Sequence, residues 1–355
     1  MLNSNVSMYA AIQARVRAMC SMLLTSPVWA DLCEAEKFNL LIESIRPTAY
    51  GPYLGCVEPD LLTPRRAIFQ IKQRLAETYL SVIRLAPGST RALLTQLYRH
   101  FEIDNLKAVL RGIVTGVAWE QVLYVLFPFG PKTVLPARRM MEAGSIEAAV
   151  DLLRGTVYYD TLAHSMERYV AEQSLFPLEV ALDLTYWRTL WRDVNQLPSG
   201  DHIQALRIVG SLVDMNNLMW AIRYQVYHHL SEEEIINYTL PFGYRVQDEH
   251  IRSVAAGADI AQTVTRLYPQ LTNVDALLQQ PQRGLPELGL QLQRQVAEQC
   301  RTAFAAYPFH VGILLGYLIL TEWETHDLTV LIEAKAANMP VDQFESHLLV
   351  GCSST

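Results

Sequence analysis

Apolar residues recur at helical spacing along nearly the whole chain. Three such stripes are Leu75, Tyr79, Val82 and Ile83; Leu178, Leu182, Tyr186 and Leu190; and Leu314, Leu315 and Leu318. Alternating strand patterns are scarce. The Pro and Gly clusters "PTAYGPYLG", "PFGPKTVLP", "LPSGD" and "QQPQRGLP" fall between the helical stretches. We therefore predict an all-α protein of about 15 to 20 helices, since helices average about 11 residues.

One segment of the chain recurs with its polar residues in register. Residues 101–130, "FEIDNLKAVLRGIVTGVAWEQVLYVLFPFG", match residues 212–243, and both segments end in Pro-Phe-Gly. Placing Asn105 on Asn217 puts Glu102 on Asp214 and Arg111 on Arg223. A weaker third copy, residues 322–351, has Glu324 and Asp327 at the equivalent positions and Glu333 at the arginine position.

A second pattern also repeats. "LLIESIRPTAYGPYL" (40–54) matches "AAVDLLRGTVYYDTL" (148–162), so that Thr48 and Tyr50 fall on Thr156 and Tyr158. Residues 260–278 keep the apolar spacing but lose the Thr-x-Tyr pair. We predict three related helical units, 1–130, 131–243 and 244–355. Three such copies favour a pseudo-threefold body with an opening along its axis.

The repeated acid, asparagine and arginine have two interpretations. Glu102 and Asn105 share a helix face beside an apolar stripe, and Arg111 shares a face with Asp104. Such groups clamp neighbouring helices through bidentate hydrogen bonds, or they build an active site. Duplicated packing is expected in related units, whereas a catalytic centre present twice and degraded in a third copy is not. We interpret the set as a structural clamp without catalytic residues.

Other candidate chemistry is weaker. Ser231 followed by Glu234 indicates a helix capping box and not an acidic metal cluster. Glu322 and His326 are four apart and suit a shared metal, but no further His or Cys supports that, so we predict an interface histidine and no metal. We expect Glu179 and Asp183 to be solvated. No phosphate loop or catalytic motif occurs, which predicts neither cofactor nor enzymatic activity.

Composition narrows the classes of partner. Half of the 355 residues are hydrophobic and 18% are charged, so surface is available for a partner. The net charge of −7 argues against binding nucleic acid or anionic lipid by electrostatics. The longest apolar stretch, "FHVGILLGYLILTEW", is too short to span a bilayer, and no signal peptide is evident. Five scattered cysteines favour reduced thiols in a cytosolic protein.

Taken in order, these segments resemble a known family. "RHFEIDNLKAVLRG", "LVDMNNLMWAIRYQVYHHLSEEEIINYTLPFG" and "YPFHVGILLGYLILTEWETHDLTVLIEAKAANMPVDQFESHLL" are similar to the three repeats of the C subunit of V-type ATPases, the prokaryotic counterpart of the eukaryotic d subunit. The elements "YAAIQARVRAMCSMLL" and "IRPTAYGPYL" also resemble it. Glu333 and the missing third Thr-x-Tyr depart from the internal symmetry.

The resemblance implies a three-lobed helical funnel on the cytoplasmic face of the rotating proteolipid ring. The lower end of the central shaft would enter the funnel, and the subunit would transmit torque between head and ring without catalysing a reaction. Two alternatives stay open at this stage: a helical adaptor of another assembly, and an enzyme with an unrecognised all-α active site. Neighbouring genes for shaft and proteolipid would favour the rotor subunit over the adaptor. A cleft with converging acids of perturbed pKa would favour the enzyme.

Overall fold

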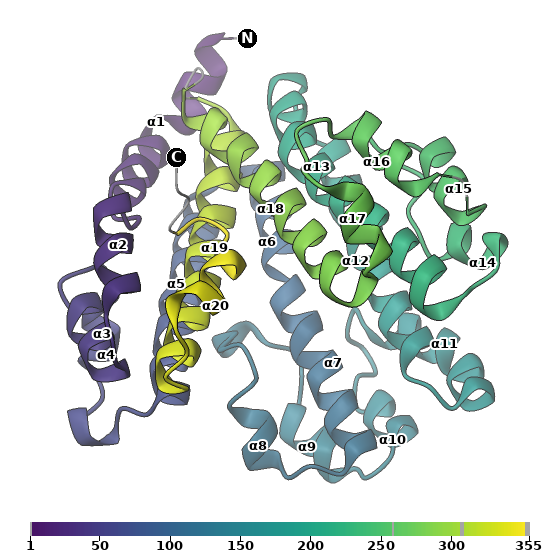
Figure 1. The fold of residues 1–355 in the computed structure, drawn as a ribbon, viewed down its shortest axis with the longest axis horizontal. Helices are drawn as coiled ribbons and strands as arrows, with labels where there is room; N and C mark the ends of the chain where they lie inside the picture. Colours follow the sequence, from purple (N-terminus) through teal and green to yellow (C-terminus); the bar gives the residue numbers. More distant parts are fainter. Residues whose placement is uncertain (1, 258, 306–308, 352–355) are drawn as a thin grey trace.

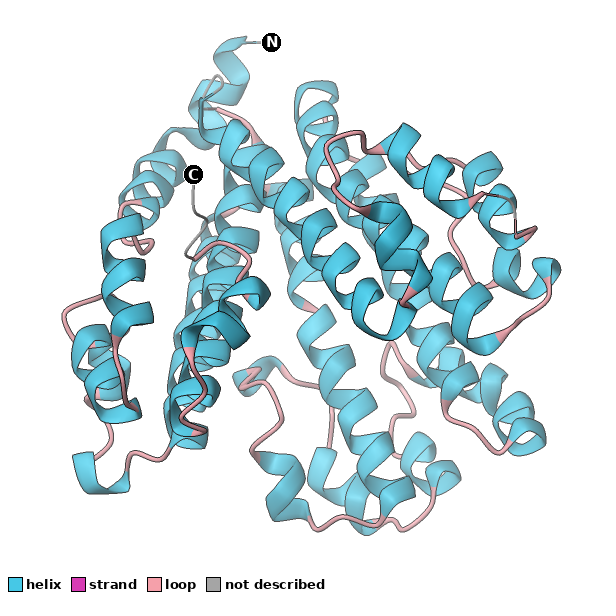
Figure 2. Cartoon of the chain, viewed as in Figure 1, coloured by secondary structure: helices cyan, strands magenta, loops and turns pink. Residues whose placement is uncertain are grey.

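The prediction of an all-α protein is confirmed. The computed structural model describes residues 2–257, 259–305 and 309–351, of which the regular elements are all helical (Figure 2). No β-strand occurs among these residues.

The described part of the chain contains twenty α-helices. They are α1 (Leu2–Cys20), α2 (Ser26–Glu34), α3 (Phe38–Ile45), α4 (Gly51–Leu54), α5 (Pro64–Leu85), α6 (Gly88–Tyr98), α7 (His100–Thr115), α8 (Trp119–Leu123), α9 (Ala137–Glu142), α10 (Ile146–Asp151), α11 (Tyr159–Glu172), α12 (Phe176–Asn195), α13 (Ser199–Arg223), α14 (Glu232–Asn237), α15 (Asp248–Ala255), α16 (Ile260–Leu267), α17 (Val274–Gln279), α18 (Pro281–Ala305), α19 (Val311–Ala336) and α20 (Val341–Phe344). Short 3₁₀ turns cover Pro59–Leu61, Gly130–Lys132 and Glu345–His347, and a π-helical turn, Tyr224–His228, follows α13.

Local sequence signals place several helix ends. The Thr63 hydroxyl accepts a hydrogen bond from the Arg66 amide at the start of α5, and Pro64 occupies the first helical position. At the end of α7, Gly116 adopts a left-handed conformation with φ of 65°, which stops the helix. These caps supply partners for backbone groups that a helix end would otherwise leave unpaired.

The helices gather in three groups (Figure 1). One group contains α1–α5 together with α19 and α20, the second contains α7–α10, and the third contains α11–α17, while α6 and α18 lie between the groups. The chain therefore begins and ends in the same group. Among the described residues, no helix has the length and apolar character needed to cross a membrane.

Two apolar cores account for this arrangement. The larger core contains residues from α1 and from each of the helices α5 to α19. The smaller core packs Leu41, Ile45 and Ile71 from the start of the chain against Leu331 and Phe344 from its end. Burial of apolar side chains is the main favourable term in folding, so this second core holds the two ends of the chain together.

The cysteines depart in one place from the expectation of reduced thiols. Cys20, Cys56 and Cys300 are free. Cys33, on α2, is disulfide-bonded, so the interpretation is wrong at this position.

Candidate functional site

The repeated asparagines each bind a loop that follows their own helix. On α7, the Asn105 side chain donates from Nδ2 to the Phe127 carbonyl oxygen (2.9 Å) and accepts from the Phe127 amide (2.6 Å). Phe127 precedes Pro128, which favours extended backbone there. The side-chain amide therefore satisfies both backbone groups of one extended residue, as a neighbouring strand would.

The second and third copies repeat this contact. Asn217, on α13, donates to the Leu240 carbonyl oxygen at 3.0 Å and accepts from the Leu240 amide at 2.9 Å. Asp327, on α19, has no amide to donate, and its carboxylate instead accepts from the amides of Leu349, Val350 and Gly351. All three side chains are at least nine-tenths buried. The loop geometry thus follows the chemistry of the side chain.

Each of the repeated acids accepts a hydrogen bond from the hydroxyl of a tyrosine in another copy of the repeat. Glu102 accepts from Tyr158 at 2.6 Å, and Glu324 accepts from Tyr50 at 2.8 Å. Asp214 lies 3.5 Å from the Tyr268 hydroxyl, and also accepts from three backbone amides. The acid of each copy therefore contacts the tyrosine of the next copy, and the third contacts the first.

The two Thr-x-Tyr elements have the same local geometry. Thr48 and Thr156 each donate to the carbonyl oxygen three residues earlier, at 2.7 Å. Each also accepts from the amide of the tyrosine two residues later, at 3.2 and 3.3 Å. Tyr268 takes the equivalent partner without a threonine at the matching place. Comparison of the repeated segments missed Tyr268, because the third copy has no Thr-x-Tyr pair. It keeps only the position of the tyrosine hydroxyl beside the acid.

The arginines do not pair with the repeated acids. Arg111 forms two hydrogen bonds with Glu179 on α12, at 2.6 and 2.8 Å. Arg223 is exposed and makes no hydrogen bond or ion pair with another described residue. Glu102 and Asp214 bind tyrosine and backbone groups instead, so each repeated acid has partners other than the arginine of its own copy. The interpretation of the set as a structural clamp stays a prediction.

Glu179 and Asp183 were expected to be solvated, and that expectation is also wrong. Asp183 pairs with Lys107 on α7, one helical turn from the Arg111–Glu179 pair. Burial raises the pKa of Asp183, and the nearby Lys107 ammonium partly offsets this. Two ion pairs spaced by one turn on each helix thus join α7 to α12.

Two further predicted features can be placed. The Ser231 and Glu234 capping box is confirmed, with Ser231 Oγ accepting from the Glu234 amide at 3.3 Å. Glu322 and His326 do not pair with each other. Glu322 accepts from the Tyr79 hydroxyl at 2.9 Å and lies 3.2 Å from Nε2 of His100, whereas Nδ1 of His326 lies 3.2 Å from Asp327. Within the described ranges, no group of three or more His, Cys, Asp or Glu side chains is arranged to hold a metal.

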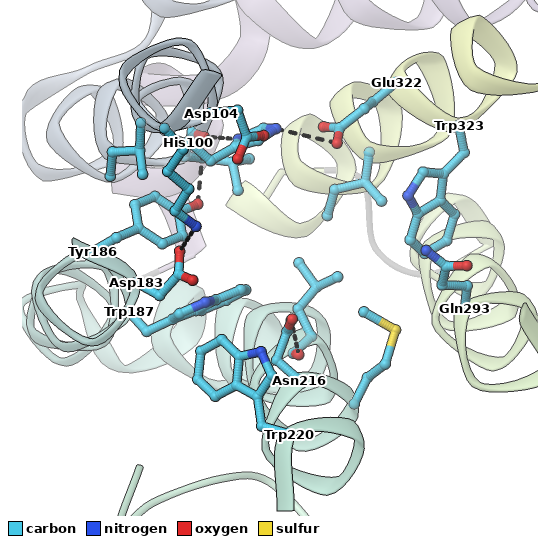
Figure 3. A pocket seen from close by; sticks show the side chains of 16 residues that line it. His100, Asp104, Asp183, Tyr186, Trp187, Asn216, Trp220, Gln293, Glu322 and Trp323 are labelled. Carbon is cyan, nitrogen blue, oxygen red and sulfur yellow. Dashed lines mark hydrogen bonds and ion pairs between the residues drawn. The ribbon is translucent and has the colours of Figure 1, made fainter. Parts of the chain in front are cut away.

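Three clefts meet where the repeat helices α7, α13 and α19 converge. The central cleft, of about 310 Å³, lies between α7, α12, α13, α18 and α19 (Figure 3). A second, of about 500 Å³, lies between α5, α7 and α19, and a third, of about 380 Å³, lies between α13, α18 and α19.

The residues that precede Asn105, Asn217 and Asp327 each border two of the three clefts. Asp104 borders the central and second clefts, Asn216 borders the central and third, and His326 borders the second and third. Each side chain precedes Asn105, Asn217 or Asp327 by one position. Equivalent positions of the three copies therefore surround one hollow region.

The central cleft combines aromatic walls with charged pairs. His100 faces Glu322, and Lys107 faces Asp183. Burial lowers the pKa of His100, but the adjacent Glu322 carboxylate outweighs burial and raises this pKa to about 9. His100 is thus cationic at neutral pH. These pairs leave no free nucleophile beside a free base, and the cleft suits binding better than bond-breaking chemistry.

A family model decides what these repeats belong to. Residues 12–347 match the model of the ATP synthase (C/AC39) subunit. The chain belongs to this family. The resemblance inferred from the repeated segments is thereby confirmed, and the chain is a non-catalytic stalk subunit of a rotary ATPase.

Relatives of this family match over almost the full chain. The C subunit of the A-type ATP synthase of Methanocaldococcus jannaschii is 24% identical over 346 residues, covering 96% of this chain and 86% of the relative. The same subunit of Methanococcoides burtonii is 25% identical, covering 97% of this chain and 95% of the relative. That of Archaeoglobus fulgidus is 22% identical, covering 98% and 97% respectively.

Proposed function

We propose that this chain is the central rotor subunit that sits on the proteolipid ring and receives the lower end of the central shaft. In this position, on the cytoplasmic side of the membrane, it couples ATP hydrolysis or synthesis in the head to ion transport through the ring. Membership of the ATP synthase (C/AC39) family supports a place in the rotary complex. The position between ring and shaft is our own inference.

The single observation that carries the proposal is the arrangement of clefts around α7, α13 and α19. Asp104, Asn216 and His326 hold equivalent places in the three copies, and each borders two of the three clefts. A shaft that enters along this pseudo-threefold axis contacts all three copies at once. Torque is then shared among three helices instead of falling on one.

The same proposal gives the repeated residues a mechanical role. We propose three interlocking units, 1–130, 131–243 and 244–355, which form a funnel. Glu102, Asn105, Asp214, Asn217, Glu324 and Asp327 would hold the loops and neighbouring copies in place around the shaft. Because these side chains are buried and hydrogen-bonded, they resist rearrangement under load more than exposed ion pairs do.

Attachment to the ring is expected to use protein contacts. An acidic chain with net charge −7 gains nothing from an anionic lipid surface. We therefore expect no association with anionic liposomes that lack the proteolipid ring, and association once the ring is incorporated. Binding to the bare liposomes would contradict this part of the proposal.

Removal of the subunit from the complex tests the coupling role. We expect ATP hydrolysis by the free head to continue and ATP-driven ion pumping to be lost, because the catalytic sites lie in other subunits. Restoring the chain to the depleted complex should restore pumping. If pumping persists at the normal rate without the chain, the coupling role is wrong and an adaptor role replaces it.

A further inference from the structure

A row of apolar side chains on α11 lies partly open to solvent. Its members recur at i, i+4, i+7 and i+11, which places them on one helix face: Tyr159, Ala163, Met166 and Val170. Only Leu162 of α11 is buried, whereas Val170 is 52% exposed. An apolar stripe that the chain itself leaves uncovered commonly marks a surface for a partner protein.

All four side chains line a groove between α10 and α11. The groove has a volume of about 460 Å³, and Val150 of α10 contributes to its other wall. Both helices lie toward the lower right edge of the molecule in Figure 1. None of the described residues that line this groove borders the three clefts around α7, α13 and α19. The groove is therefore a separate surface from the one assigned to the shaft.

Three carboxylates form the rim of this groove: Glu147 and Asp151 on α10, and Glu167 on α11. All three residues are exposed. Asp151 pairs with Arg154 at 2.7 Å, and the same guanidinium lies 4.7 Å from the centroid of the Tyr159 ring. Glu147 and Glu167 form no ion pair with a described residue, and no described lysine, arginine or histidine lines the groove. The rim therefore carries two uncompensated negative charges.

The walls of the groove determine which backbone conformation an occupant takes. Both walls are helical, so most of their backbone groups are already bonded along their own axes. An extended segment would find few backbone partners there and would lose those it has in water. A helix satisfies its own backbone groups and needs only an apolar face to bind. The stripe from position 159 to 170 is about 16 Å long at about 1.5 Å per residue, which matches about three turns of a partner helix.

The acidic rim selects among amphipathic helices. Lysine and arginine extend their alkyl stems along an apolar surface while their charged heads reach outward. Such residues beside the apolar face of a partner helix would reach Glu147 and Glu167, whereas acidic residues in the same places would be repelled. Anionic lipid and nucleic acid are disfavoured for the same reason.

We propose that the groove between α10 and α11 binds a basic amphipathic helix of about three turns from a partner protein. The apolar face of that helix covers the stripe of α11, and its lysine or arginine side chains pair with Glu147 and Glu167. This inference does not depend on the position between ring and shaft, because the groove shares no described lining residue with the clefts around α7, α13 and α19.

Two synthetic helices of about fourteen residues test the proposal on the full chain. One carries leucine on one face, lysine on both flanks and alanine elsewhere, and the other has glutamate in place of every lysine. By fluorescence anisotropy at about 0.15 M salt, we expect the lysine peptide to bind at one site and at least about tenfold more tightly than the glutamate peptide. It should also slow amide hydrogen exchange in α10 and α11 and leave α2 and α3 unchanged.

Substitutions in the groove provide a second measurement. Ala163→Gln keeps a good helix former and fills the groove, so it should weaken binding of the lysine peptide by about tenfold or more. Ile203→Gln, at a position on α13 that is 57% exposed, is its matched control and should bind as the natural chain does. Glu147→Gln and Glu167→Gln should each weaken binding by about 2- to 5-fold, as expected for exposed ion pairs. Glu120→Gln, at an exposed position on α8, should have no effect.

Other results would overturn the proposal. Equal binding of the two peptides would show that the acidic rim selects nothing, and protection of α2 and α3 instead of α10 and α11 would place the peptide elsewhere. If the natural chain forms dimers that Ala163→Gln abolishes, as seen by sedimentation, the occupant is a second copy and not a basic partner helix. The two peptides and the exchange pattern of the natural chain decide the matter even if a substituted chain fails to fold.

Discussion

The hydroxyl of Tyr50 donates a 2.8 Å hydrogen bond to Oε1 of Glu324, although 274 residues of sequence separate the two. Both side chains are buried, and Oε2 of Glu324 also accepts from the Leu24 amide at 2.6 Å. The guanidinium of Arg74 lies over the Tyr50 ring, 4.2 Å from its centroid. One carboxylate on α19 thus fastens the first part of the chain to the last.

Removing the Tyr50 hydroxyl should weaken the contact between the first and last parts of the chain. We expect Tyr50→Phe to lower the free energy of unfolding by about 1–2 kcal/mol, because a buried acceptor loses one partner. Urea unfolding followed by circular dichroism measures the change. Tyr53→Phe is the control, since that hydroxyl binds Glu77 in an exposed place and its loss should cost less. Equal losses in the two variants would contradict the closure role.

Glu324 should make stability depend on pH in an unusual direction. Burial raises its pKa from the ordinary 4.5 to about 7. Between these values the folded chain holds a proton that the unfolded chain has released, so this group's contribution to stability falls as pH rises from 4.5 to 7.

Glu324→Gln should therefore gain stability relative to the natural chain over this pH range, by roughly 3 kcal/mol in total. Urea unfolding at intervals from pH 4.5 to 8 gives the comparison. Glu43→Gln, at an exposed position on α3, should produce no such divergence. A constant difference between Glu324→Gln and the natural chain across this range would show that Glu324 titrates normally.

Asn217 should not tolerate a carboxylate, although the third copy carries one. Its Nδ2 lies 3.0 Å from the Leu240 oxygen and 3.2 Å from the Phe242 oxygen, so Asn217→Asp would set negative charge against two carbonyls. We expect a loss of about 2–4 kcal/mol at pH 7, measured by urea unfolding.

Asn216→Asp provides the matched control for this change. Asn216 is partly exposed and donates only to the Leu212 carbonyl oxygen one turn earlier. Its replacement should cost less than about 1 kcal/mol, because the new carboxylate stays solvated. A similar loss at positions 216 and 217 would mean that charge alone, and not the loop contact, sets the cost.

Gly243 should resist the addition of a single methyl group. A Cβ there would overlap Oδ1 of Asp214 and the Val246 carbonyl oxygen. We expect Gly243→Ala to destabilise the chain by about 2 kcal/mol or more, since the carboxylate must leave its backbone donors. Gly289→Ala, inside α18 and 3.7 Å from Cε of Met219, should stabilise by about 0.5–1 kcal/mol. Melting temperatures that fall alike in both variants would contradict this.

The two arginines should differ in their effect on stability. Arg223 has no bonded partner among the described residues, so Arg223→Ala should change the free energy of unfolding by less than about 0.5 kcal/mol. Arg111→Ala breaks an exposed bidentate pair with Glu179 and should cost up to about 1 kcal/mol. A larger loss at Arg223 than at Arg111 would contradict this assignment of partners.

The sequence by itself determined what depends on near neighbours and on repetition. Helical periodicity predicted an all-α chain, because the apolar residues on the buried face of a helix recur every three or four positions in the sequence. The capping box could also be predicted, because its two partners, Ser231 and Glu234, lie within one helical turn of each other. The repeated segments gave the family resemblance because their order survives even where single residues change.

Only the tertiary structure decided which distant groups meet. Arg111 has Asp104 two turns away on its own helix, yet it binds Glu179 on α12, 68 residues along the chain. Glu324 could not be matched to Tyr50 from spacing, because that contact exists only where the start of α4 packs against α19. Trp187, Trp220 and Trp323 line one cleft only because α12, α13 and α19 pack around it. Local spacing fixes the face that a residue occupies on its helix, but the path of the whole chain fixes what that face meets.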